Sequence, residues 1–153
     1  MKYYILIYFI SILNIQSQTF AKHFKTNDFD VAIFPGNLKD PINFEGFDIT
    51  KEEVIKAEKK LKSNLKLINV NLENQYNTPI IHKKLKKYKR QYIGLYDEKG
   101  KKYLLINAFW SKHKEENWLN EIIYVSDGGS YYWNIRYYID IDELKELNVN
   151  GNS

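Results

Sequence analysis

The sequence predicts an α+β fold in which one amphipathic helix packs on a four- to five-stranded antiparallel meander sheet. Two observations lead to this prediction. Residues 50–68 carry apolar side chains at helical spacing, whereas residues 91–150 alternate between apolar and polar side chains and are interrupted by turn sequences. Because strands joined by short turns pair antiparallel, the second half of the chain is expected to form consecutive hairpins.

Length and composition fit one small globular domain. The chain has 153 residues, of which 44% are hydrophobic and 27% charged, a balance that disordered and collagen-like chains lack. The absence of cysteine excludes disulfides, iron–sulfur clusters and thiol nucleophiles. The net charge is +4, but only Arg90 and Arg136 are arginines, and a nucleic-acid-binding protein is expected to be more basic and richer in arginine. Nucleic acid is therefore not an expected partner.

Residues 1–17 have the pattern of a signal peptide. Lys2 is followed by a mostly apolar stretch that is too short for a membrane-spanning helix of about 20 residues. Cleavage is expected after Ser17, or alternatively after Ala21, which leaves residues 18–153 as one exported domain in the periplasm or outside the cell. A buried N-terminal strand and an uncleaved anchor are the alternatives.

The start of the expected domain, residues 18–48, is predicted to be irregular. It contains three structure-breaking pairs, which are Pro35-Gly36, Asp40-Pro41 and Glu45-Gly46. Within it, apolar side chains alternate over residues 29–33, and this alternation predicts one short strand.

The helix has a clear start and a clear apolar face. Thr50 and Glu53 have the spacing of a capping box, in which each side chain accepts a hydrogen bond from the other residue's backbone N–H. Ile49 before the cap is placed for a hydrophobic staple with Val54. The apolar stripe consists of Val54, Ala57, Leu61, Leu65 and Ile68.

Turn sequences separate the elements that follow the helix. A second short helix is expected from Thr78-Pro79, since proline suits the first helical turn. Residues 97–100 and 127–129 contain glycine at positions that suit hairpin turns. The expected strands cover residues 91–96, 101–110, 120–126, 130–141 and 144–150.

Alternation within two of these strands assigns their faces, because successive side chains of a strand point to opposite sides. One face is apolar and is expected to form the core beneath the helix. Its members are Leu104, Ile106, Ala108, Trp110, Tyr131, Trp133, Ile135, Tyr137, Ile139 and Ile141.

The opposite, outer face of the predicted sheet is polar but rich in aromatic residues. Aromatic rings and arginine dominate binding hot spots, so this face is a candidate surface for a glycan or a protein. The candidate residues are Tyr103, Asn107, Phe109, Tyr132, Asn134, Arg136 and Tyr138. The alternatives are ordinary cross-strand packing and cover by residues 18–48.

The order of one helix followed by a curled antiparallel sheet resembles the cystatin-like folds. The run at 87–94, the turn at 125–129 and the ending at 149–151 also look like small exported bacterial proteins of unknown function. This resemblance covers residues 45–151 and implies a fold and a location. The inhibitory Gln-x-Val-x-Gly loop of true cystatins is absent, so protease inhibition is not implied.

Motifs for catalysis and for cofactors are absent from the sequence. The three histidines lack the ligand spacing of a metal site, and the chain contains no phosphate-binding or dinucleotide-binding glycine loop. His113 with Glu115 or Glu116 offers the one candidate pair for acid–base chemistry. A solvated charged loop is the alternative interpretation of these three residues. No cofactor and no metal are expected.

A basic run forms a second candidate surface. Six of its eight positions are basic, namely Lys83, Lys84, Lys86, Lys87, Lys89 and Arg90. Such a run favours contact with an anionic surface, which could be lipopolysaccharide phosphate, an acidic glycan or nucleic acid. A solvated turn whose lysine content reflects codon usage is the alternative.

The sequence therefore favours an exported, non-enzymatic binding domain that uses the outer sheet face. A small exported hydrolase acting through His113 and Glu116, and a structural envelope protein, are the alternatives. Exposed clustered aromatic rings would favour binding, whereas His113 facing a carboxylate in a deep cleft would favour catalysis.

Overall fold

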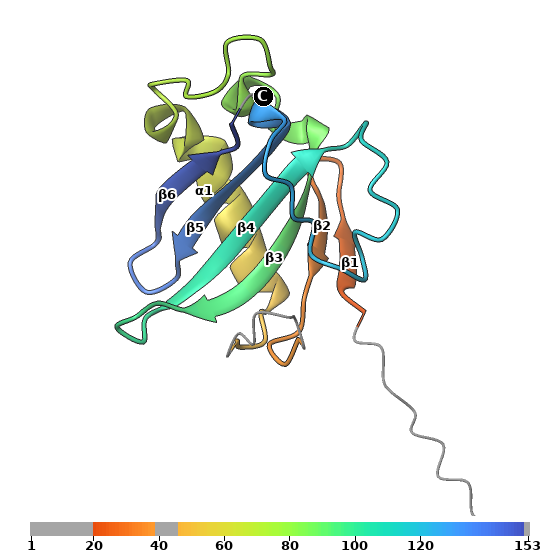
Figure 1. Ribbon diagram of the computed structural model, residues 1–153. Coiled ribbons are helices and arrows are strands. Elements are labelled where there is room, and N and C mark those ends of the chain that lie inside the picture. Colours follow the sequence, from red (N-terminus) through yellow and green to blue (C-terminus); the bar gives the residue numbers. More distant parts are fainter. Residues whose placement is uncertain (1–19, 39–45, 152–153) are drawn as a thin grey trace, which may run out of the picture.

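Figure 1 shows the computed structural model, which describes residues 20–38 and 46–151. A six-stranded sheet with the strand order β1-β2-β3-β4-β5-β6 carries one long helix, α1 (Lys51–Ile68), across one face. The architecture is α+β with a mostly antiparallel sheet, which confirms the predicted class. The predicted signal peptide, residues 1–17, lies outside the described residues.

Four strands form the predicted meander, each antiparallel to the next. In the β3–β4 hairpin, Gly100 has a φ of 74°, a left-handed conformation that glycine adopts without steric cost. The four strands are β3 (Tyr88–Tyr96), β4 (Lys102–Trp110), β5 (Tyr132–Tyr138) and β6 (Glu143–Val149).

Two N-terminal strands bring the sheet to six, above the four or five that the sequence predicts. β1 (Lys22–Lys25) and β2 (Asp30–Ile33) pair antiparallel within the segment expected to be irregular. β2 coincides with the predicted short strand, but it pairs parallel to β3, with Val31 opposite Arg90. The connection permits parallel pairing, because α1 lies between the two strands and supplies the crossover that parallel neighbours require.

The helix begins as the sequence predicts. Thr50 Oγ1 accepts from the Glu53 backbone N–H at 3.2 Å, and Glu53 Oε2 accepts from the Thr50 backbone N–H at 2.8 Å. Ile49 is buried, in keeping with the expected staple, and so are Val54 and Leu61 of the stripe. The second short helix is present only as two 3₁₀ turns, Ile81–Lys83 and Leu85–Lys87.

The core lies between α1 and one face of the sheet. Leu61 and Leu65 of the helix belong to the same buried cluster as Ile106, Trp133 and Tyr137 of the sheet. The predicted core face is therefore confirmed for β4 and β5. Ile141 is an exception: it is 48% exposed because it follows the end of β5, in the turn before β6.

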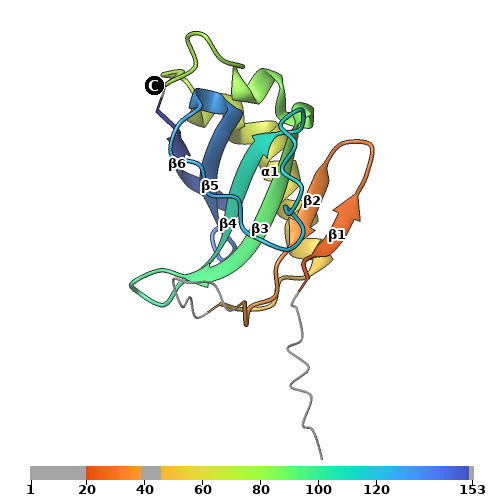
Figure 2. The ribbon, with the colours of Figure 1, turned by 45° about the vertical axis from the view of Figure 1, so that its right-hand side comes forward.

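The opposite face is covered by a segment that the sequence assigns to a strand. No strand forms over residues 120–126; instead, residues 111–128, here termed the covering segment, connect β4 to β5 by a long excursion over the sheet (Figure 2). Trp118 and Ile123 of this segment pack with Phe109 and Ile93 of the sheet in a second hydrophobic cluster.

No helix in the described ranges 20–38 and 46–151 combines the length and the apolar character needed to cross a bilayer.

Candidate binding surfaces

The covering segment buries the centre of the candidate outer face. Phe109 is 1% exposed, and its ring centroid lies 6.0 Å from that of Trp118. Asn107 donates from Nδ2 to the backbone oxygen of Ile123 at 2.8 Å, and Asn134, opposite Asn107 on β5, is half-buried. The central candidate residues thus lie under other parts of the same chain.

A buried amide holds the covering segment on the sheet. Gln91 has no exposed surface, and its Nε2 donates to the backbone oxygens of Trp118 and Glu121, each at 2.7 Å. Its Oε1 accepts from the Ile123 N–H at 2.8 Å and from Asn107 Nδ2 at 3.0 Å. The nitrogen and the oxygen of the Gln91 amide thus both make hydrogen bonds to polar groups of the covering segment in the protein interior, where such groups need partners.

The candidate catalytic histidine takes part in a cluster that braces the same segment. The Tyr132 hydroxyl lies 2.9 Å from His113 Nδ1 and donates to Glu115 Oε1 at 2.8 Å. Burial and the Glu115 carboxylate raise the pKa of Tyr132 to about 12, so its hydroxyl keeps its proton at neutral pH. Glu115 is therefore the carboxylate of this cluster, whereas Glu116 is exposed.

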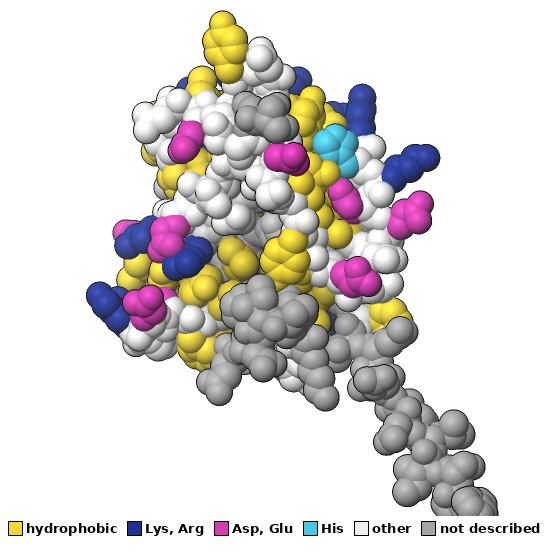
Figure 3. All heavy atoms as spheres, viewed as in Figure 1, with side chains coloured by type: hydrophobic (Ala, Val, Ile, Leu, Met, Phe, Trp, Pro, Cys, Tyr) yellow, Lys and Arg dark blue, Asp and Glu magenta, His cyan; other side chains and the backbone are white. Residues whose placement is uncertain are grey.

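One end of the outer face stays open. Tyr103, Arg136 and Tyr138 line a groove of about 550 Å³, here termed the hairpin groove, between the β3–β4 and β5–β6 hairpins. Arg136 donates from Nη1 to Glu146 Oε2 at 2.7 Å, and its side chain is 37% exposed. Figure 3 shows basic and acidic side chains gathered at the left of this face, where the two hairpins end.

Cations stand over the tyrosine rings of the hairpin groove. The Arg136 guanidinium carbon lies 4.8 Å from the ring centre of Tyr103, and Lys145 Nζ lies 5.8 Å from that of Tyr138. Tyr103 and Tyr138 are 7% and 9% exposed. The groove therefore presents charged groups and the edges of tyrosine rings. The faces of the Tyr103 and Tyr138 rings are already covered by Arg136 and Lys145.

The predicted basic run is divided among three environments. Arg90 is fully buried and donates from Nε to Glu58 Oε1 at 2.6 Å, so its expected role in a surface contact is not supported. It points toward the helix because side chains alternate along β3, which places Arg90 on the same side as Tyr88 and Tyr92. Lys89 points to the other side, with Nζ 4.5 Å from the ring centre of Trp118.

The Arg90 guanidinium connects α1 to the place where the basic run continues into β3. Its Nη2 donates to Glu58 Oε2 at 3.1 Å, and its Nη1 donates to the backbone oxygens of Leu85 and Tyr88. The Tyr92 hydroxyl adds a bond of 2.8 Å to Glu58 Oε1. All three nitrogens of the guanidinium and both oxygens of the carboxylate thus make hydrogen bonds, which compensate for the burial of the charge pair.

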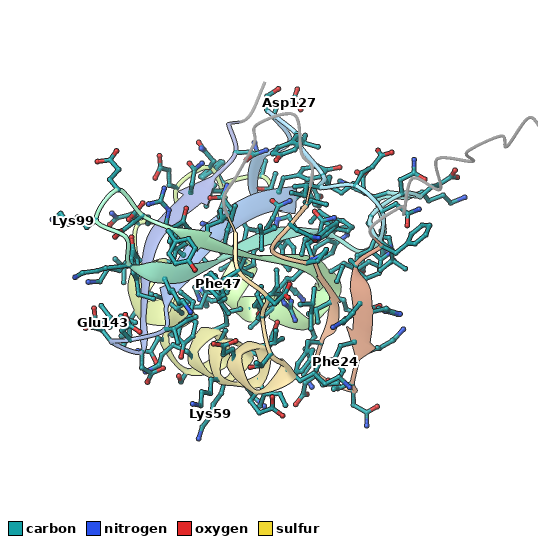
Figure 4. The ribbon with its side chains drawn as sticks, turned by 90° about the horizontal axis from the view of Figure 1, so that it is seen from below. Phe24, Phe47, Lys59, Lys99, Asp127 and Glu143 are labelled. Atoms are coloured by element: carbon teal, nitrogen blue, oxygen red, sulfur yellow. The ribbon has the colours of Figure 1, made fainter. Side chains whose placement is uncertain are left out.

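The remaining four lysines of the run join lysines of α1 around a second groove. This groove, here termed the lysine groove, has a volume of about 640 Å³ and lies between α1 and the 3₁₀ turns. Figure 4 shows Lys59 projecting from the side of α1 away from the sheet, far from Lys99 of the β3–β4 hairpin. Its six lysines are Lys59, Lys62, Lys83, Lys84, Lys86 and Lys87.

Asp28, in the β1–β2 turn, connects the two sides of the lysine groove. Its carboxylate bonds to Lys86 Nζ and lies 3.7 Å from Lys62 Nζ. These two ammonium groups lower the pKa of Asp28 below its usual value. The carboxylate therefore stays ionised and neutralises part of the positive charge.

Comparisons with known proteins give no family assignment: no family model, no curated protein and no solved structure matches this chain. Within the described residues, no three histidine, aspartate or glutamate side chains converge in a way that could hold a metal ion.

Sequence reasoning missed the residues that shape these surfaces. Gln91 carries a weak signal, as a polar residue among the apolar residues of β3. Lys59 and Lys62 lie off the apolar stripe of the helix, and nothing local in the sequence indicates that the distant basic run lies beside them. The Phe29 and Ile55 positions likewise become part of a site only through the fold.

Proposed function

We propose that this chain is an exported, non-enzymatic binding domain that holds a protein partner in the hairpin groove. The supporting observation is that the covering segment closes the centre of the outer face and leaves its end open, where Arg136 is held in place by Glu146. An arginine fixed by a neighbouring carboxylate loses little conformational entropy on binding, which favours its use as an anchor.

The chemistry of the groove favours a protein over a glycan. Sugars stack on free aromatic faces, but Arg136 and Lys145 already stand over the rings of Tyr103 and Tyr138. Tyr96, at the edge of the groove, is 42% exposed and offers one aromatic anchor. A partner with mixed charges and backbone hydrogen-bonding groups complements this arrangement.

The bonds of His113 support a bracing role over the alternative of a hydrolase. The Nδ1 contact to Tyr132, which in turn bonds to Glu115, braces the covering segment and leaves only Nε2 of His113 for acid–base chemistry. A catalytic base also needs a cleft in which it reaches the substrate. Neither large groove is lined by His113.

Arg136→Ala tests the groove. We expect it to abolish capture of a partner from the envelope and secreted fractions of the native cells, with a stability change within about 1 kcal/mol, as for other exposed ion pairs. Lys22→Ala, which changes an exposed cation on β1, is the matched control and should capture normally. Stability loss with unchanged capture would refute the proposal, and binding on a glycan array that depends on Arg136 would replace the protein with a glycan.

Export is tested separately. N-terminal sequencing of the protein from native cells should find a start near Gln18 in the periplasm or the medium, as the signal-peptide pattern implies. A chain that retains Met1 in the cytosolic fraction would contradict this part of the proposal. A protein that stays in the envelope without any specific partner would point to the structural alternative.

A further inference from the structure

The lysine groove is strongly positive, and its acidic groups are already paired. Six lysines surround it, against the two carboxylates of Asp28 and Glu58. Glu58 is bound by Arg90, and Asp28 lies between Lys62 and Lys86. A concave site with one sign of charge concentrates ions of the opposite sign. The charge pattern therefore calls for an anionic ligand.

The lining between the lysines is apolar. Phe29 and Leu85 are half-buried in it, and Ile55 is 49% exposed although it lies within a helix flanked by charged residues. The aliphatic stems of Lys59 and Lys62 extend this surface, since lysine covers apolar area with its methylene groups. A ligand that fills the groove must therefore have an apolar portion as well as negative charge.

The volume of the lysine groove is in the range of sites that bind small molecules. Its volume of about 640 Å³ falls within the roughly 300–1,000 Å³ that small-molecule sites occupy. Lys62 and Lys86 both reach the Asp28 carboxylate, so two ammonium groups of the groove converge on one anion. This convergence favours a head group with more than one negative charge. A phosphomonoester carries about −1.5 to −2 charges and three strong acceptor oxygens at neutral pH.

We infer that the lysine groove binds a single-chain amphiphile with a phosphomonoester head group. The chain lies along Phe29, Ile55 and Leu85, and the phosphate is held by ammonium groups at the rim. This site is on the opposite side of the sheet from the hairpin groove, so it is independent of the function proposed above.

Three ligands separate the two parts of this recognition. Oleoyl lysophosphatidate, used below its micelle-forming concentration, should bind the purified protein. Monoolein has the same chain without the phosphate, and glycerol 3-phosphate has the phosphate without the chain. Each should bind at least about tenfold more weakly, because each loses one class of contact. Binding of lysophosphatidate should also weaken as salt is raised.

Matched variants assign the binding to the groove. Lys59→Gln with Lys84→Gln should weaken lysophosphatidate binding by about tenfold or more, whereas Lys99→Gln with Lys101→Gln, in the β3–β4 hairpin, should not. Ile55→Ser should weaken binding, and Leu67→Ser, which changes a 71% exposed residue of the same helix outside the groove, should leave it unchanged.

One variant should bind lysophosphatidate more tightly than the parent protein, and a misfolded protein would not show such a gain. Asp28→Asn removes the carboxylate that competes for Lys62 and Lys86 and should tighten lysophosphatidate binding several-fold. Equal affinity for glycerol 3-phosphate would overturn the inference in favour of a simple anion site, and equal affinity for monoolein would remove the role of charge. Displacement of lysophosphatidate by a glutamate-rich peptide at lower concentration would assign the groove to an acidic protein segment instead.

Discussion

Both faces of the sheet are covered by other parts of the chain, but by different means, and the outer face keeps an open end at the hairpin groove. α1 covers one face with a periodic apolar stripe that packs on Ile106 and Trp133. The covering segment, which has no regular secondary structure over most of its length, covers the other face with Trp118 and with backbone groups bonded to Gln91. One face of a sheet can thus be covered by a helix that is recognisable from its apolar periodicity. The other can be covered by an irregular segment whose sequence shows no such periodicity.

Consecutive residues of β3 anchor the two covers. Arg90 and Tyr92 bond to Glu58 of α1, whereas Gln91 between them bonds to residues 118–123 on the opposite side. Because strand side chains alternate in direction, one short stretch of β3 carries polar anchors for both layers. The helix side uses a charge pair and the outer side a neutral amide, so the two sides should respond differently to substitution.

The largest expected effect tests whether both faces are true core. Trp133→Ala, beneath the helix, and Phe109→Ala, beneath the covering segment, should each lower the free energy of unfolding by about 3–5 kcal/mol, the usual cost of deleting a large buried ring. Both residues are 1% exposed. Urea unfolding of the two variants checks this. A loss below about 1 kcal/mol for Phe109→Ala alone would show that the covering segment leaves the sheet in solution.

Removing one member of the Arg90–Glu58 pair on the helix side should lower the free energy of unfolding strongly. Replacing both members with apolar residues should lower it much less. Arg90→Met leaves Glu58 buried without its partner and should cost about 3–5 kcal/mol, whereas Arg90→Met combined with Glu58→Leu should recover much of that loss. Chemical denaturation of the single and double variants gives the coupling between them. Additive losses in the double variant would argue against a direct pair.

The amide on the outer side should act more locally. Gln91→Leu removes the bonds to Trp118, Glu121 and Ile123 and should cost about 1–3 kcal/mol, the penalty for leaving buried backbone groups unpaired. Limited proteolysis should then cut within residues 111–128 faster than in the parent chain. Unchanged cleavage of this segment would mean that its apolar contacts alone hold it.

The smallest effect is expected at alkaline pH, with one tyrosine on each side. The pKa of Tyr132 and that of Tyr137 are both raised to about 12 by burial and by the nearby carboxylates of Glu115 and Asp142. An unfolded tyrosine has a pKa of about 10, so the folded state holds more protons above that pH and stability should fall between about pH 10 and about pH 12.

Phenylalanine variants resolve this alkaline effect. Tyr132→Phe and Tyr137→Phe should each reduce the slope of stability against pH in that range, measured by urea unfolding at a series of pH values. If neither variant changes the slope, other groups set the alkaline limit, among them the buried Tyr88 and Tyr92, whose pKa values are also raised by burial.

The sequence by itself determined the elements whose signals are local. Thr50 and Glu53 fixed the start of α1, because a capping box needs only four residues. Alternation assigned Ile106, Trp133 and Ile135 to the helix-facing core, since the direction of a side chain on a strand depends only on its position along that strand.

Only the tertiary structure decided what covers each face and which residues meet at the surface. Alternation grouped Tyr103, Phe109 and Arg136 on one side, but the covering segment buries Phe109 and leaves Arg136 in an open groove. The same holds for the lysine groove, where Lys59 of α1 meets the basic run only after the crossover brings the 3₁₀ turns beside the helix. A strand pattern reports which side chains share a face, whereas burial of that face depends on contacts between segments far apart in the chain, which local periodicity does not encode.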